Sequence, residues 1–269
     1  MNVTDFRARS KTAPSAAKAA DLTVVGGAGH VGIPLVLAFA SKGSSVNVND
    51  LNEDTLATLK AGRLPFIEHG ADELLTKALK DKRLFFTSKP SEISTRGPVI
   101  VTIGTPVDKF LNPERQVIQD CIDALLPHLR DGQLLVLRST LYPGTTDWIE
   151  SHIKSMGRTL KVAFCPERIV QGFGIEELGR MPQIISGTTR EAEEEAAALF
   201  KQVVPELVRL TPIEAEFAKL FGNAYRYIEF AVTNQFYLIA KSAGLDYHRI
   251  LSAMKHNYQI GRASCRERV

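Results

Sequence analysis

From Asp21 onward, short runs of β-branched and other apolar residues alternate with longer stretches of helical periodicity. This alternation is typical of a parallel β-sheet whose strands are joined by helices that cover both faces. The pattern therefore predicts an α/β fold with a doubly wound parallel sheet. The runs expected to be strands are Leu22–Val25, Ser45–Asn49, Leu84–Thr87, Val99–Ile103, Leu134–Arg138, Lys161–Phe164, Gln183–Ser186 and Leu207–Leu210.

The rhythm changes after Thr211-Pro212, where a stretch without proline predicts one long helix over about Ile213–Ala243. A helix of that length spans roughly 45 Å, which is longer than a typical crossover helix. Because its apolar residues lie nearly all around it, we expect it to be buried. A second helix is expected over Asp246–His256.

These changes divide the chain into four segments. Residues 1–20 lack periodicity and are expected to form a flexible tail, with a short transit peptide as the alternative. Residues 21–210 hold the α/β domain, residues 211–258 the long helix and the start of a helical domain, and residues 259–269 a second tail.

Composition and charge mainly exclude classes of protein. Hydrophobic residues make up 44% and charged residues 23%, as in ordinary globular proteins. The net charge of +3 is not gathered in one run, so nucleic acid is not an expected partner. Cys121, Cys165 and Cys265 form no CxxC pair, so neither a metal site nor a disulfide framework is expected. Without a signal peptide or an apolar membrane span, the protein is expected to be cytoplasmic.

A glycine-rich loop follows the first strand and opens a helix, in the pattern GxGxxG. Gly27 permits the tight turn, Gly29 lets the backbone approach a pyrophosphate, and Gly32 lets the helix pack on the strand. His30 and Val31 complete the loop. A lone GxGxxG could be an ordinary turn, but its position between strand and helix favours a dinucleotide site.

An acid in the expected position supports the same interpretation. Asp50 ends the second strand, 18 residues past Gly32, where a carboxylate can accept hydrogen bonds from the adenosine ribose. A carboxylate repels a 2′-phosphate, and the next residues, Leu51 and Asn52, supply no arginine. NAD is therefore the predicted cofactor, rather than NADP.

Polar residues also follow three later strands, and in an open parallel sheet such residues meet at the ligand-binding edge. Glu167 is the candidate general base or water activator, with a solvated surface carboxylate as the alternative. In the segment after the fifth strand, Pro143-Gly144 could equally be an ordinary turn, and Thr145 or Thr146 an ordinary helix N-cap. The polar residues are Thr105 and Pro106 after the fourth strand, Ser139 and Thr140 after the fifth, and Glu167 and Arg168 after the sixth.

The long helix carries a polar stripe, because Glu216, Lys219, Asn223 and Arg226 share one face by their spacing. On a helix with little other polar surface, Lys219 and Asn223 are expected to face a pocket. Lysine by charge and asparagine by a directed hydrogen bond can stabilise an oxyanion. The alternative is a surface ion pair between Glu216 and Lys219.

Together these motifs resemble the UDP-glucose/GDP-mannose dehydrogenase family over about Leu22–Tyr258. The resemblance rests on GAGHVG with the following Ile-Pro, the acid after the second strand, GRLPFIEHG, GTP, STLYPGTT, PER and AEFAKLFGN, in that order. It implies a Rossmann-like NAD-binding domain followed by the spine helix of an incomplete helical dimerisation domain, and a homodimer.

The resemblance also implies a reaction: oxidation of a UDP-sugar C6 alcohol to a uronic acid for polysaccharide precursors, with two NAD reduced in succession. A cysteine holds the intermediate as a thiohemiacetal and then a thioester. Thr140 and Glu167 would position water or hydrolyse the thioester, while Lys219 and Asn223 would stabilise the oxyanion. Implied cofactor contacts are Gly27, Gly29, His30, Val31, Gly32, Asp50, Thr105, Pro106, Ser139 and Thr140, and implied substrate contacts are Glu167, Arg168, Lys219 and Asn223.

The PER triplet resembles the branch that acts on UDP-N-acetylhexosamines, especially UDP-N-acetylmannosamine. Two features depart from the family pattern. Gly26 is an extra glycine, expected to lengthen the strand end, and Cys265 lacks the glycines that flank the family's catalytic cysteine. We therefore expect a C-terminally truncated chain, without the nucleophile and inactive by itself.

Two other functions are compatible with the sequence. β-Hydroxyacid dehydrogenases also place lysine and asparagine four residues apart on a helix after a Rossmann domain, and they use one NAD per turnover without a thiol. An inactive module that binds NAD and dimerises is the second alternative.

Overall fold

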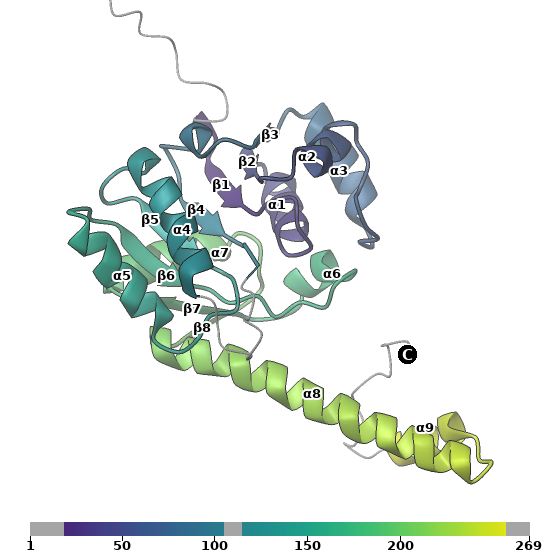
Figure 1. Cartoon of the computed structure of the whole chain (residues 1–269). Helices are drawn as coiled ribbons and strands as arrows, with labels where there is room; N and C mark the ends of the chain where they lie inside the picture. Colours follow the sequence, from purple (N-terminus) through teal and green to yellow (C-terminus); the bar gives the residue numbers. More distant parts are fainter. Residues whose placement is uncertain (1–18, 105–114, 257–269) are drawn as a thin grey trace, which may run out of the picture. The chain divides into compact units, whose positions relative to one another are not determined.

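The computed structural model of the chain describes residues 19–104 and 115–256 (Figure 1). It divides into two compact units, Met1–Glu216 and Phe217–Val269. The first unit holds the sheet and the helices that cover it. The second holds most of helix α8 (Pro212–Ser242) together with α9 (Tyr247–Lys255).

Among the described residues, eight strands form one sheet in the order β3-β2-β1-β4-β5-β6-β7-β8. Because β1 pairs with β2 on one side and with β4 on the other, the chain winds outward in both directions from β1. The predicted doubly wound α/β fold is thereby confirmed. The strands are β1 (Leu22–Val25), β2 (Val46–Asn49), β3 (Leu84–Thr87), β4 (Val99–Val101), β5 (Leu134–Leu137), β6 (Lys161–Phe164), β7 (Gln183–Gly187) and β8 (Leu207–Arg209).

Helices cover both faces of the sheet, as right-handed crossovers require. On one face α1 (Gly32–Ser41) packs beside α7 (Arg190–Phe200), where the rings of Phe39 and Phe200 lie 6.2 Å apart. On the other lie α4 (Arg115–Leu125) and α5 (Thr145–Ser155), joined by a hydrogen bond between the His152 ring and the Asp123 carboxylate. Three further α-helices of the first unit are α2 (Glu53–Lys60), α3 (Ala71–Lys80) and α6 (Gly174–Leu178).

The sheet departs from the all-parallel prediction at one pair of strands. β6 and β7 run antiparallel, with Phe164 opposite Ser186. The connection between them does not cross the sheet, since Gln183 at its end still donates a hydrogen bond to the Pro166 carbonyl near its start. Without a crossover, the next strand returns in the opposite direction. Gln183 therefore lies at the edge where β5 and β6 end.

The long helix is confirmed, but the prediction that it is buried is wrong for this chain. Its side chains are mostly exposed, including Phe221 at 66%, Tyr227 at 79% and Ile239 at 63%. The first turn is different, because Ala215 and Glu216 are fully buried. The apolar surface of α8 exceeds what the described residues of one chain cover.

Candidate functional site

A pocket of about 590 Å³ opens at the carboxyl ends of β1, β2 and β4. It lies between β1 and β4, the point where the winding of the sheet reverses and where open α/β sheets bind ligands. Glycine-loop backbone forms part of it and apolar side chains form much of the rest, which suits a flat heterocycle joined to phosphates. Its lining includes Gly26, Gly29, Asp50, Leu51, Thr102, Val117, Asp120 and Cys121.

The glycine loop is shaped by close backbone contacts. A Cβ atom on Gly32 would lie 2.4 Å from the Gly26 carbonyl oxygen and 2.6 Å from the Gly27 Cα. A Cβ atom on Gly27 would lie 2.7 Å from the Val24 carbonyl oxygen. Both positions therefore require glycine, and α1 packs directly on the turn. At Gly29 the nearest atom to such a Cβ is 3.4 Å away, which leaves room for a ligand on the pocket side.

The extra Gly26 does not lengthen the strand, contrary to the sequence expectation. β1 ends at Val25, and Gly26 adopts φ +72°, in the left-handed region where a side chain is strained. A Cβ atom added to Gly26 would also lie only 3.1 Å from the Thr102 backbone. Gly26 is thus a turn residue. Later in the loop, His30 is exposed and its ring contacts that of Phe66, with centroids 3.8 Å apart and planes tilted by 31°.

Asp50 lies in the pocket wall and also holds the loop. Its Oδ2 accepts the backbone N–H of Ala28 at 3.1 Å, and its Oδ1 accepts that of Asn52 at 3.0 Å. A carboxylate has about four acceptor positions, so positions remain on both oxygens for ribose hydroxyls.

The α4 wall of the pocket was not predicted from the sequence. Val117, Asp120 and Cys121 line it, although none belongs to a motif after a strand. The signal is their helical spacing, which places them on one face of α4. Burial raises the pKa of the Cys121 thiol to about 11, so this side chain is an apolar wall and not a nucleophile.

Glu167 is buried, which excludes the alternative of a solvated surface carboxylate. Its Oε2 forms an ion pair with Arg138, a fully buried side chain that follows β5. Its Oε1 accepts the backbone N–H groups of Arg168 at 2.6 Å and Ile169 at 2.9 Å. Three of about four acceptor positions are therefore used, and one remains on Oε2.

The sequence analysis did not single out Arg138. The feature that could have identified it is its position as a charged residue at the end of an apolar run. Its Nη1 also donates to the Cys165 carbonyl at 3.1 Å and to the Gln183 Oε1 at 2.9 Å. The guanidinium lies over the Phe200 ring, 5.1 Å from its centroid. One side chain thus joins the ends of β5 and β6 to the start of β7.

The other predicted site residues of the first unit differ in burial and in their hydrogen-bond partners. Ser139 donates from its hydroxyl to the Ile103 carbonyl at 2.6 Å, while Thr140 is half-buried beside it. The Arg168 side chain donates to the Pro182 carbonyl. Thr105 and Pro106 lie outside the described residues, as does Cys265.

The proposed surface ion pair of Glu216 is wrong. Glu216 is fully buried, and its Oε2 accepts the Gly144 N–H at 2.6 Å. Its Oε1 accepts both the N–H and the hydroxyl of Thr146, at 2.8 and 2.6 Å. The carboxylate satisfies free N–H groups at the start of α5, where negative charge is favoured.

Lys219 and Asn223 belong to the second unit, on α8. Lys219 is half-buried and Asn223 is exposed. Their spacing keeps them on one face of the helix, and their role beside Glu167 stays a prediction.

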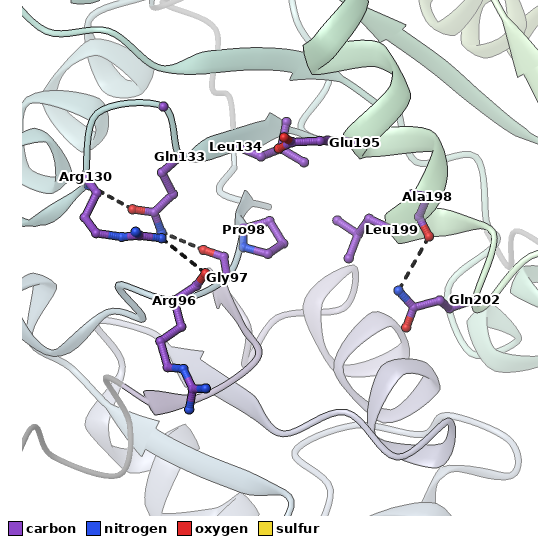
Figure 2. Close-up of a pocket in the computed structure, with 11 residues that line it drawn as sticks. Arg96, Gly97, Pro98, Arg130, Gln133, Leu134, Glu195, Ala198, Leu199 and Gln202 are labelled. Atoms are coloured by element: carbon purple, nitrogen blue, oxygen red, sulfur yellow. Dashed lines mark hydrogen bonds between the residues drawn. The ribbon is translucent and has the colours of Figure 1, made fainter.

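A second pocket, of about 430 Å³, lies at the opposite edge, before β4 and β5 (Figure 2). The Gln133 amide in it donates to the carbonyls of Ser94 at 2.9 Å and Gly97 at 2.6 Å. Its Oε1 accepts the Arg130 N–H, so the side chain joins two loops and has no free donor. The carboxyl-edge pocket is therefore the candidate site.

In residues 19–104 and 115–256 no three His, Cys, Asp or Glu side chains are arranged to hold a metal ion. No helix in that part of the chain is long and apolar enough to cross a membrane.

Comparison with family models decides the relationship. Residues 20–204 match the NAD-binding domain of the UDP-glucose/GDP-mannose dehydrogenase family, and residues 213–268 match its central domain. The chain belongs to this family. Its cofactor is NAD, and the match to the central domain extends further toward the C-terminus than the sequence motifs indicated.

Named relatives include UDP-N-acetyl-D-mannosamine dehydrogenase from Methanococcus maripaludis, 30% identical over 86% of this chain and 54% of that protein. NDP-N-acetyl-D-galactosaminuronic acid dehydrogenase from Ralstonia nicotianae is 27% identical over 87% of this chain and 58% of that protein. The structure of a UDP-glucose dehydrogenase from Pyrobaculum islandicum superposes with a TM-score of 0.80 at 26% identity, covering 93% of this chain and 59% of that one. The chain spans about half the length of the relatives it matches.

The Arg138–Glu167 pair predicts a large loss of stability when one partner is removed. Arg138→Met leaves Glu167 buried without its counter-charge, so the free energy of unfolding should fall by about 3–5 kcal/mol. The double variant Arg138→Met/Glu167→Leu should recover part of this loss. Urea unfolding measures both, with Arg180→Met as control, since Arg180 pairs with Glu176 at the surface. A loss for Arg138→Met no larger than for Arg180→Met would contradict the expectation.

Proposed function

We propose that this protein oxidises the C6 alcohol of a UDP-sugar to the uronic acid, with NAD as oxidant, in polysaccharide precursor synthesis. The observation that carries the proposal is the pocket at the switch point, bounded by the glycine loop and Asp50. A UDP-N-acetylhexosamine, and UDP-N-acetylmannosamine above all, is the proposed substrate. The PER triplet and the names of relatives such as the Methanococcus maripaludis enzyme support this choice.

The residues present fit NAD. The backbone of Gly29 and the N-terminus of α1 would hold the pyrophosphate, and Asp50 the adenosine ribose. Bound NAD supplies the hydride acceptor. His30, Val31, Ser139 and the undescribed Thr105 and Pro106 complete the proposed cofactor contacts.

Glu167 is proposed to orient the water that hydrolyses the thioester, together with Thr140. The acceptor position left on Oε2 supports this role, because the carboxylate is otherwise fixed by Arg138 and two backbone amides. Lys219 and Asn223 are proposed to stabilise the oxyanion, and Arg168 to contact the substrate. We also propose that the protein is cytoplasmic, homodimeric and without affinity for nucleic acid.

Cofactor choice is tested by calorimetry on this chain. NAD should bind more tightly than NADP, and Asp50→Ala should weaken NAD binding roughly tenfold, because a hydrogen bond to a charged group is lost. Asp50→Ser combined with Leu51→Arg should improve NADP binding. Asp54→Ala, which removes an exposed acid outside the pocket, is the control. Tighter binding of NADP than NAD by the unmodified chain would refute this choice.

Dimerisation is expected through α8, whose apolar side chains the described residues leave exposed. Light scattering at tens of micromolar should give twice the chain mass. Ile228→Asp should shift the mass toward the monomer, whereas Lys255→Asp on α9 should not. A strictly monomeric mass for the unmodified chain would contradict the expectation.

We propose that these 269 residues alone bind NAD without producing uronic acid. Cys165 is fully buried and Cys121 has a raised pKa, so neither supplies a thiolate. Incubation with NAD and UDP-N-acetylmannosamine, UDP-N-acetylglucosamine or UDP-glucose should yield no steady NADH. Two NADH per uronate, abolished by Cys265→Ser, would overturn the proposal. One NADH per turnover without thiol dependence would instead favour a β-hydroxyacid dehydrogenase.

A further inference from the structure

We propose that Glu68 is a positioning residue that locks the loop carrying Glu167 against the cofactor helix α1. Glu68 lies between α2 and α3 and is 2% exposed. Its Oε2 accepts the Gly172 N–H and its Oε1 the Ile175 N–H, each at 3.1 Å. Within the described part of the chain no lysine, arginine or histidine forms an ion pair with it. Two amides more than a hundred residues away therefore hold a buried carboxylate.

The neighbours of Glu68 contact both sides of the site. His69 donates its N–H to the Gly172 carbonyl at 2.9 Å, and its ring lies 4.7 Å from that of Phe173. On the other side, the Phe66 ring contacts the ring of His30 in the glycine loop. The short segment 66–69 thus bridges the cofactor loop and residues 172–175.

Residues 169–175 also pack directly on α1. A Cβ atom on Gly174 would lie 2.8 Å from the Pro34 Cγ and 2.6 Å from the Ile169 Cδ1. Ile169 in turn donates its N–H to Glu167. Contacts therefore run from Glu167 through Ile169 and Gly174 to the first turn of α1, and Glu68 holds this loop in place.

The lock deepens the proposed function and rests on it, since that reaction requires the cofactor and Glu167 in fixed relative positions. Linkage is reciprocal: if the lock supports NAD binding, then NAD strengthens the lock. Bound NAD should therefore slow hydrogen exchange at the Gly172 and Ile175 amides in the unmodified chain.

Hydrogen exchange followed by NMR on the full chain tests both parts. Without NAD, Glu68→Gln should speed exchange of the Gly172 and Ile175 amides roughly tenfold or more, because bonds to a charged acceptor are lost. Phe66→Ala should leave that basal exchange near the unmodified rate but abolish the slowing by NAD. Glu73→Gln, which removes an exposed acid on α3, should change neither.

Unchanged exchange in Glu68→Gln would overturn the lock, and equal slowing by NAD in Phe66→Ala would overturn the coupling. Glu68→Asp, shorter by one methylene, supplies the same comparison if Glu68→Gln does not fold. Calorimetry of NAD binding, run in parallel, separates a failure of the proposed cofactor function from a failure of the lock. Absence of NAD binding by the unmodified chain would refute the cofactor function and the coupling. Exchange of the Gly172 and Ile175 amides measured without NAD would still test whether Glu68 holds the loop.

Discussion

A fully buried arginine organises the carboxyl edge of this sheet. The Arg138 guanidinium has no contact with water, and such a charge is tolerated when it is paired and hydrogen-bonded. Its partners come from three places: Glu167 after β6, the Cys165 carbonyl, and Gln183 at the start of β7. The reversed direction of β7 brings Gln183 to this edge. The buried charge and the antiparallel strand are therefore parts of one arrangement.

Buried glutamates fix the loops at the same edge. Glu68, Glu167 and Glu216 each accept at least two hydrogen bonds from backbone N–H groups. Hydrogen bonds to an ionised acceptor are stronger than neutral ones, so each carboxylate fixes backbone N–H groups that have no partner within a helix or strand. The loops around the candidate site are thus held by hydrogen bonds within the chain itself.

Local sequence patterns were sufficient for part of this structure. Strand positions followed from apolar runs, and the glycine loop and Asp50 from their spacing around the first two strands. The direction of β7 did not follow, because hydrophobic periodicity is the same for a strand running either way. The partners of Arg138 and Glu68 lie far away in sequence, and no local pattern identifies such pairs. The sequence singled out Asp50, Glu167 and Glu216 among the acids, but not Glu68, and it did not indicate that Glu68, Glu167 and Glu216 are buried.

In helix α8 the observed exposure of the side chains differs from the burial that the sequence pattern predicted. Its apolar residues predicted burial, and at Glu216 the structure provides it, with a carboxylate fixed to the start of α5. Beyond that first turn, residues such as Tyr227 and Ile239 remain exposed. Leaving so many apolar side chains in water is unfavourable, and the described residues of one chain do not cover them. The pattern therefore identified the apolar surface of α8 correctly, and the proposed homodimer would cover that surface.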